Sequence, residues 1–412
     1  MSKQLLFLIF SWAFVSANAQ LTWVKRTNFP DKRDNQYSFS ANGKIYFGGG
    51  RDQSGNVYGD MWEFNPSTNV WTQKQSFPSG FERYGAKAMV LNGKAYIIAG
   101  WKQSGSPLEL QDVWEYDPTL NTYNKKKNLP ATFTGRYAYV AFTIGNKGYM
   151  GLGYGTWRDD FASYDPSTDT WTNLANFPGA ARSTASAFAT GNYGYVGFGI
   201  QSPNSFKDFY QYNPSNNTWT ALPAFPGDNR SGSVGFALNN KGYVVGGIDD
   251  NLSNSNFVGS EVWEFNPIGN LWTKLPNIPD TLSNSGAAIS GNSAYIGLGN
   301  KCVNTYAISN NTHSFWEFTS TTGIDNTTEN NANTITALLH NDKTFDLYFK
   351  EPTIAEGDLV IIDNNGRVVS NTTIPCASEK FKINLYDLAD GMYVFRYQSR
   401  AFRYSSKFVL MF

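Results

Sequence analysis

The chain has 412 residues, and 33 basic residues balance 33 acidic ones, so its formal net charge is zero. This balance argues against a nucleic-acid partner or attraction to an anionic membrane, because both need an excess of positive charge. Aromatic residues make up 16% of the chain and charged residues only 16%, with 38 glycines, which indicates an all-β protein with many turns.

The first segment, residues 1–19, has the pattern of a secretory signal peptide. Lys3 precedes an apolar stretch at 5–15 that is too short to span a bilayer, and Ala17 and Ala19 form a small-residue cleavage site. We therefore expect a mature chain that begins at Gln20. No later segment is apolar enough to cross a membrane, so we expect no membrane span in the mature chain.

Residues 20–320 contain a repeat with a period of about fifty residues. Each unit has a segment similar to NGKIYFGGG at 42–50, with a glycine four residues after its tyrosine. These tyrosines are Tyr46, Tyr96, Tyr149, Tyr195, Tyr243 and Tyr295. Thirteen residues before them stand Arg33, Arg83, Arg136, Arg182, Arg230 and, in the sixth unit, Leu282.

A hairpin such as MWEFNPSTNVWTQ at 61–73 completes each unit. Asn or Asp followed by Pro favours a type I turn between its two strands. The unit therefore has four short strands, which is typical of a β-propeller blade. The paired glycines, the spacer and the aromatic pair resemble the Kelch family, which implies a propeller fold.

Two incomplete copies of the hairpin indicate how the propeller closes. Trp23 belongs to a fourth strand with no blade before it, and Trp316 belongs to a third strand with no fourth strand after it. Together they complete one blade, so we predict six blades closed by the N-terminal strand, which leaves no exposed sheet edge.

The repeated arginines have two interpretations. They could form an anion-binding crown, or each could pair within its blade with an acid four residues before the third-strand aromatic residue. The pairs would be Arg33–Asp60, Arg83–Asp112, Arg136–Asp160, Arg182–Asp208 and Arg230–Glu261. The blade that has Leu282 in place of arginine also has Ser314 in place of the acid. Because both are missing together, we favour structural ion pairs.

The loops after the second and fourth strands share one face, and their sequences vary from blade to blade, as functional loops do. The candidate ligand-binding residues on this face are Trp101, Tyr154, Trp157, Arg158 and Phe257. Exposed aromatic residues could contact a glycan or a protein. Alternatively they pack between blades, which is the interpretation that we favour for Tyr154, Phe206 and Phe257.

Evidence for an enzyme is sparse. The only histidines are His313 and His340, and no Cys/His cluster has metal-ligand spacing, so we expect no metal and no cofactor. The copper chemistry of galactose oxidase, which also has a Kelch-type propeller, would need more histidines. A resemblance in fold to bacterial sialic-acid mutarotases implies an alternative, because epimerisation needs only an acid–base pair and an arginine.

After a polar linker at 321–333, residues 334–412 have the pattern of a small β-sandwich. Strand pairs surround the turns Asn365-Gly366 and Asp390-Gly391. The segments at 360–369, 388–396 and 407–412 resemble the C-terminal sorting domain of the type IX secretion system. A departure is that LLHNDKTFDLYF at 338–349 lacks the prolines with which this family usually opens. Cys302 and Cys376 could form one bridge between the domains or remain thiols.

The sequence thus predicts an exported propeller, released or held at the outer surface, that presents its variable loops to a glycan or protein. We expect a monomer whose C-terminal domain is read by the secretion machinery. The alternatives are a glycan-processing enzyme and a structural surface component.

Overall fold

The structure is a computed structural model that describes residues 21–105, 108–249, 258–302, 308–320, 335–339, 344–349, 357–363, 368–375, 378, 380–385, 387–388, 391–399 and 403–410. The chain divides into two compact units, one of residues 21–320 and one that contains residues 321–412. Among the described residues, none forms a helix with the length and hydropathy that crossing a membrane requires.

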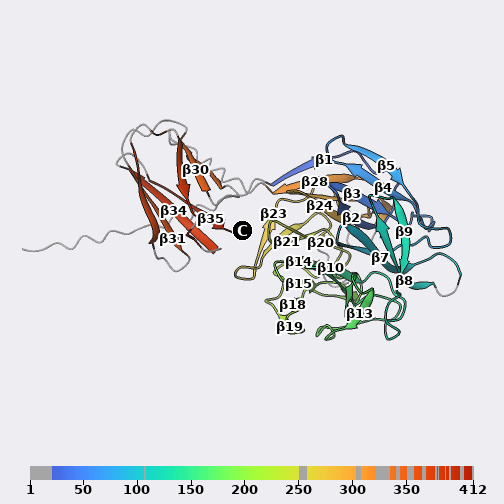
Figure 1. The fold of residues 1–412 in the computed structure, drawn as a ribbon. Coiled ribbons are helices and arrows are strands. Elements are labelled where there is room, and N and C mark those ends of the chain that lie inside the picture. The colour runs from blue at the N-terminus through green and yellow to red at the C-terminus, as the bar shows by residue number, and fades with distance from the viewer. Residues whose placement is uncertain are drawn as a thin grey trace, which may run out of the picture. The chain divides into compact units, whose positions relative to one another are not determined.

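The first unit is a six-bladed β-propeller, as the repeat predicts (Figure 1). Each blade is a four-stranded antiparallel sheet whose first strand lies nearest the centre. Blade 1 has β2 (Tyr37–Ala41), β3 (Lys44–Gly48), β4 (Met61–Asn65) and β5 (Val70–Lys74). Blade 2 has β6 (Lys87–Leu91), β7 (Lys94–Trp101), β8 (Glu109–Asp117) and β9 (Thr122–Lys126). Blade 3 has β10 (Val140–Ile144), β11 (Lys147–Gly151), β12 (Phe161–Asp165) and β13 (Thr170–Asn173).

The remaining blades follow the same order. Blade 4 has β14 (Ser186–Thr190), β15 (Tyr193–Gly197), β18 (Phe209–Asn213) and β19 (Thr218–Ala221), and blade 5 has β20 (Val234–Leu238), β21 (Lys241–Val245), β22 (Val262–Asn266) and β23 (Leu271–Leu275). Blade 6 has β24 (Gly286–Ser290), β25 (Ser293–Gly297), β28 (Phe315–Ser320) and β1 (Leu21–Lys25). Two small hairpins on the loop face, β16 (Ile200–Gln201) with β17 (Asn204–Ser205) and β26 (Asn300–Cys302) with β27 (Ile308–Asn311), are additions that the sequence pattern did not predict.

Strand β1 closes the propeller by pairing with β28, from Leu21 opposite Ser320 to Lys25 opposite Trp316. Trp23 lies opposite Phe318, and their ring centroids are 4.8 Å apart. The predicted closure by the N-terminal strand is confirmed. This closure stabilises the propeller because the ladder between β1 and β28 pairs backbone groups that an open sheet edge would leave without partners.

The core lies between neighbouring blades. One buried cluster, for example, joins Tyr37 and Tyr46 of blade 1 to Ile97 and Tyr116 of blade 2. The hairpin aromatics belong to these clusters, so their repeated pattern is explained by packing. In the turn between β4 and β5, Asn65 accepts a hydrogen bond from the amide of Ser67 at 3.0 Å, which explains the recurrent Asn or Asp at that position.

The second unit contains two antiparallel sheets. One has β29 (Ile335–Leu339), β30 (Thr344–Phe349) and β33 (Lys380–Asn384), and the other has β32 (Val368–Ile374), β31 (Gly357–Asp363), β34 (Gly391–Ser399) and β35 (Arg403–Leu410). Leu347 and Ile383 of the first sheet and Ile361 and Phe395 of the second share one buried cluster. This unit therefore has a hydrophobic core of its own.

Candidate functional site

A closed ring of backbone hydrogen bonds surrounds the centre of the propeller on the face that carries the variable loops. One residue from each blade contributes its amide and its carbonyl, two positions after the repeated arginine. The ring consists of Asn35, Gly85, Ala138, Thr184, Gly232 and Asn284. Each amide donates to the carbonyl of the preceding blade, over 2.7–3.1 Å. All six residues have positive φ, which explains the glycines in two blades and strains Ala138 and Thr184.

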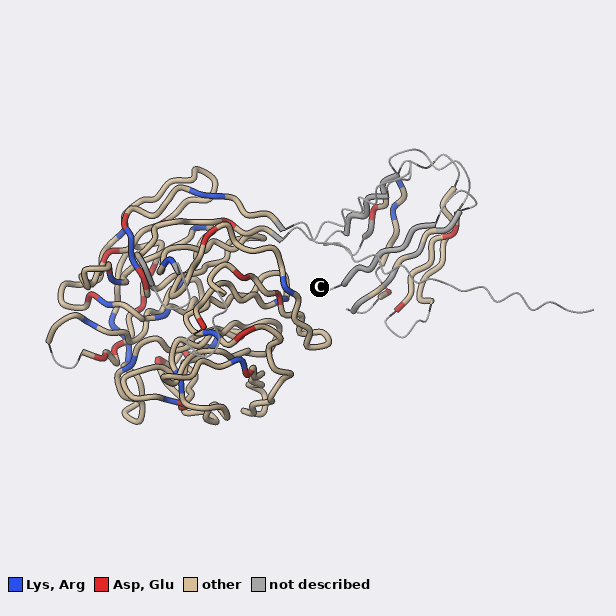
Figure 2. The backbone as a smooth tube through the Cα atoms, turned by 180° about the vertical axis from the view of Figure 1, so that it is seen from behind, with Lys and Arg blue, Asp and Glu red and all other residues tan. Residues whose placement is uncertain are grey.

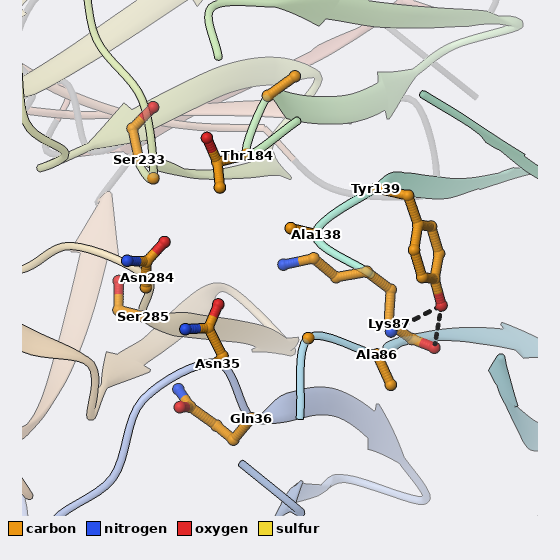
Figure 3. A pocket seen from close by; sticks show the side chains of 13 residues that line it. Asn35, Gln36, Ala86, Lys87, Ala138, Tyr139, Thr184, Ser233, Asn284 and Ser285 are labelled. Carbon is orange, nitrogen blue, oxygen red and sulfur yellow. Dashed lines mark hydrogen bonds between the residues drawn. The ribbon is translucent and has the colours of Figure 1, made fainter. Parts of the chain in front are cut away.

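The ring forms the mouth of a narrow central channel (Figure 3). The mouth is lined mainly by small or uncharged polar side chains, together with Lys87 and Tyr139. Below it the channel widens to a cavity of about 120 Å³ between the first strands of the blades. The residues that line the mouth and this cavity include no carboxylate and no arginine. The volume is smaller than the roughly 300–1,000 Å³ typical of ligand pockets, so a whole saccharide does not fit inside.

The repeated arginines lie away from the channel, inside the blades. All five are completely buried, and each lies within ion-pair distance of the acid of its own blade. Arg83, for example, donates to the two carboxylate oxygens of Asp112 at 2.7 and 2.8 Å and to the carbonyl of Ala99 at 2.8 Å. Bidentate geometry of this kind fixes the entry loop to the third strand. With these partners the arginines are not available as an anion-binding crown.

Four of the five arginines are also covered by the phenylalanine of the FP segment that follows the preceding blade, whereas Arg136 is covered by Phe133, which comes three residues after the proline of its LP segment. The guanidinium of Arg83 lies 4.5 Å from the ring centroid of Phe77, and that of Arg230 lies 4.6 Å from Phe225. This is cation–π geometry. In four blades the phenylalanine before the strand-ending proline therefore encloses the ion pair, a role that the sequence pattern did not indicate.

Asp112 remains a carboxylate although it is buried. Burial alone would raise its pKa, but hydrogen bonds from Arg83 and from Trp114 outweigh burial and hold the pKa below its ordinary value. In blade 6 the corresponding positions hold Leu282, which is completely buried, and Ser314. That blade replaces the ion pair with apolar packing.

On the loop face, just outside the ring, each blade forms an isolated β-bridge between two repeat positions. One is the residue after the repeated arginine, or after Leu282 in blade 6, and the other is the residue after the glycine that stands four positions beyond the repeated tyrosine. In blades 2 and 3 both partners are aromatic, Tyr84 with Trp101 and Tyr137 with Tyr154. In blades 4 to 6 the six positions are Ser183, Ile200, Ser231, Ile248, Ser283 and Asn300. The loop face is therefore asymmetric at these bridge positions, whose aromatic residues all lie on blades 2 and 3.

These aromatic residues form one contiguous row, which we call the aromatic row: Tyr84, Trp101, Tyr137, Tyr154 and Trp157. Ring centroids are 5.1 Å apart for Trp101 and Tyr137, 5.5 Å for Tyr137 and Tyr154, and 4.9 Å for Tyr154 and Trp157. Tyr84 contacts Tyr137 at 5.8 Å. Tyr154 is 37% exposed, and the other four are half-buried. The rings of the row therefore pack against one another, and each ring remains partly exposed to solvent.

Polar groups border the aromatic row. The guanidinium of Arg51 lies 4.6 Å from the ring centroid of Tyr84 and pairs with Asp34 at 3.1 Å. Glu109 lies opposite Trp101 in the β7–β8 ladder. Burial, with a contribution from Tyr84, raises the pKa of Tyr137 to about 12, so its hydroxyl stays neutral over the physiological range.

The structure brings together three of the candidate binding residues, Trp101, Tyr154 and Trp157. Arg158 is next in sequence, and its side chain donates a hydrogen bond to the hydroxyl of Thr134. Phe257 lies outside the described residues. Phe206 covers the guanidinium of Arg182 at 4.0 Å, in agreement with a packing role. Sequence reasoning missed Tyr84 and Tyr137, although both directly follow a repeated arginine.

Among the described residues, no group of three His, Cys, Asp or Glu side chains is arranged to hold a metal ion. The ring of His313 lies 3.2 Å from the side-chain amide of Asn28, and burial together with nearby lysines lowers its pKa. His340, Cys376 and the side chain of Cys302 lie outside the described residues.

Comparisons with known proteins agree with this architecture. Residues 10–153 match the KLHDC2/KLHL20/DRC7 Kelch-repeats domain, and residues 341–411 match the secretion system C-terminal sorting domain. With the six-bladed fold, these matches define a Kelch-repeat β-propeller followed by a type IX sorting domain. The sorting domain indicates that the protein is secreted or displayed at the cell surface.

Several relatives resemble parts of the propeller. The N-acetylneuraminate epimerase of Escherichia coli O1:K1 is 39% identical over 162 residues, covering 38% of this chain and 39% of that protein. The N-acetylneuraminate epimerase of Pasteurella multocida is 27% identical over 171 residues, covering 40% of each chain. The F-box/kelch-repeat protein At1g67480 of Arabidopsis thaliana is 32% identical over 97 residues, covering 23% of this chain and 25% of that protein. The chain thus spans less than half of each of these relatives.

The solved structure of YjhT has a similar fold. Its TM-score is 0.58 at 16% sequence identity, and the match covers 70% of this chain and 96% of that chain. At this identity the likeness concerns the fold alone.

Proposed function

We propose that this protein is a glycan-binding protein of the outer surface, and that its aromatic row is the binding surface. The observation that carries the proposal is the asymmetry of the loop face. Six blades repeat the same framework, yet only blades 2 and 3 place aromatic residues at both bridge positions. Packing alone does not require these rings, because blades 4 and 5 form the same bridges with serine and isoleucine.

The chemistry of the row suits a saccharide. Its rings offer apolar faces and edges for contact with the C–H groups of a sugar, while the hydroxyls of Tyr84, Tyr137 and Tyr154 can form hydrogen bonds with the hydroxyls of the sugar. Glu109 and Arg51 at the border supply charged hydrogen-bond partners. The rings hold one another through edge contacts, so little conformational freedom remains to be lost on binding.

A glycan-array screen followed by titration calorimetry tests the proposal. Trp101→Ala and Trp157→Ala should each weaken binding about tenfold or more, because each removes a ring from the row. Ile200→Ala is the matched control, since Ile200 occupies on blade 4 the position of Trp101 on blade 2. Binding that survives both tryptophan substitutions would reject the row as the site, and binding only to proteins would replace the glycan with a protein partner.

A second candidate is epimerisation of a sugar, which is favoured by the names of the N-acetylneuraminate epimerases among the relatives. The geometry supports it less well, because that chemistry calls for an unpaired acid and an arginine at a central pocket. The described lining of the channel offers neither, and the repeated arginines are engaged with acids. Mutarotation of N-acetylneuraminate followed by NMR, with and without the protein, distinguishes an enzyme from a binding protein.

A further inference from the structure

Lys87 places a positive charge in the mouth of the central channel. Its side chain extends into the opening from one side, and its nitrogen points toward the open middle of the ring (Figure 3). The base of the side chain is fixed, because the backbone amide of Lys87 donates to the hydroxyl of Tyr139 at 2.8 Å. Over the described part of the chain, no carboxylate forms an ion pair with Lys87. Burial lowers the pKa of its ammonium group.

A lysine at this position is not required by the fold. The equivalent first residues of the inner strands in the other blades are Tyr37, Val140, Ser186, Val234 and Gly286. Valine in two blades shows that an apolar residue starts the strand equally well. An ammonium that is partly buried without a counter-charge is unfavourable, whereas an anion beside it would offset the lost hydration. Lys87 is therefore a departure from the repeat that costs stability unless a negative charge accompanies it.

Uncharged donors lie around the same opening. Ser285 is 5% exposed and lines the mouth, and its hydroxyl has no hydrogen-bond partner among the described residues. The side chain of Asn284, a member of the ring, also lines the mouth. Both come from blade 6, whereas Lys87 comes from blade 2, so the donors approach the opening from different sides (Figure 3). An acceptor with negative charge would satisfy the hydroxyl and the ammonium together.

The size of the channel limits what can bind. The cavity of about 120 Å³ holds several water molecules or a small ion. It does not hold a sugar ring together with its substituents. The acceptor is therefore a compact group, whether it arrives as a free ion or projects from a larger ligand that stays on the loop face.

We propose that Lys87, Ser285 and Asn284 form a binding site for one compact monoanion, with the geometry of a carboxylate, in the mouth of the channel. The observations that support this site are different from those that support the aromatic row, so the proposal does not depend on glycan binding. The anion contacts the ammonium of Lys87 and accepts hydrogen bonds from the hydroxyl of Ser285 and the amide of Asn284.

Thermal unfolding in increasing sodium acetate tests the site. Ionic strength is held constant with 2-(N-morpholino)ethanesulfonate, whose tetrahedral sulfonate does not have the geometry of a carboxylate. Acetate should raise the unfolding midpoint of the wild type saturably, because it binds the folded state. Lys87→Met should weaken the apparent affinity for acetate about tenfold or more, and Ser285→Ala should weaken it by a smaller factor. Lys147→Met, which alters a lysine that is 53% exposed, is the control and should respond as the wild type does.

Lys87→Met also separates binding from a structural role. Without acetate this variant should be at least as stable as the wild type, because it removes an unpaired charge. An equal response of the wild type and Lys87→Met to acetate overturns the proposal. Titrations with glucuronate and glucose identify the source of the anion. Tighter binding of glucuronate than of acetate, with no effect of glucose, assigns the site to a carboxylate carried by a sugar, and equal affinities assign it to free ions.

Discussion

Arg83 donates one hydrogen bond to each carboxylate oxygen of Asp112, at 2.7 and 2.8 Å, and both side chains are buried within one blade. Breaking such a pair from one side leaves a charge buried without its partner, which costs about 3–5 kcal/mol. We expect Asp112→Ala to lower the free energy of unfolding by this amount in urea titrations. Asp208→Ala should cost less, because the Asp208 side chain is 34% exposed and water can replace it. Equal losses in the two variants would contradict this dependence on burial.

The sixth blade suggests how the ion pair can be replaced. It has Leu282 and Ser314 where the other blades have arginine and an acid. We expect Arg83→Leu combined with Asp112→Ser to destabilise the protein less than the sum of the two single substitutions, because the double change leaves no unpaired buried charge. A double-mutant cycle by urea unfolding measures the difference. Strict additivity would show that the two side chains do not act as a unit.

The depressed pKa of Asp112 makes its contribution depend on pH. A carboxyl group whose pKa is lower in the folded state than in the unfolded state stabilises the fold above its unfolded value, about 3.9, and loses this contribution as pH falls through the folded value. The difference in unfolding free energy between the wild type and Asp112→Asn should therefore be largest near pH 7 and shrink below about pH 4. Ser314→Ala is the control, and its effect should not change with pH. A constant difference for Asp112→Asn would show that the charge is unimportant.

The six residues of the ring around the channel mouth have positive φ, so we expect an unusual change in stability when one of them is replaced by glycine. Ala138 has φ of 54°, where a side chain is strained by roughly 1–2 kcal/mol. Ala138→Gly should therefore be neutral or slightly stabilising, although glycine also increases the entropy of the unfolded chain. Ala141→Gly, at an ordinary position of β10, should destabilise by about 0.5–1 kcal/mol. Thermal unfolding of both variants measures these changes in stability. Equal losses of stability in the two variants would mean that the strain at Ala138 is relieved in another way.

Because β1 closes the propeller, a chain that lacks this strand should be less stable and should associate with other chains. Deletion of Leu21–Lys25 exposes the edge of β28, whose unpaired backbone groups can bind another chain. We expect a lower unfolding midpoint and concentration-dependent association by light scattering. Val24→Thr keeps the strand and changes only a largely exposed side chain, so this variant should behave as the wild type. A monomeric deletion variant with an unchanged midpoint would show that closure by β1 is dispensable.

Much of the fold could be predicted from particular residues. The six tyrosines and the hairpin turns recur at regular spacing, and Trp23 and Trp316 mark two strands that together complete one blade. Of the candidate site, Trp101, Tyr154 and Trp157 could be chosen as aromatic residues in variable loops. The contact of these three residues through Tyr137 could not be predicted, because Tyr137 stands at a repeat position that carries serine in blades 4 to 6. Lys87 was also not foreseen, since its significance depends on where the channel lies.

The sequence by itself determined the number of blades, the strand that closes them and the address carried by the C-terminal domain, because each is written in residue types at regular spacing along the chain. Tertiary structure decided which way the side chains at those positions face. Only the circular arrangement brings residues from different blades to one ring, where the amide of each blade donates to the carbonyl of its neighbour, and where a lysine from one blade lines the same opening as a serine from another. Such neighbours are set by the closure of the propeller and by no local pattern.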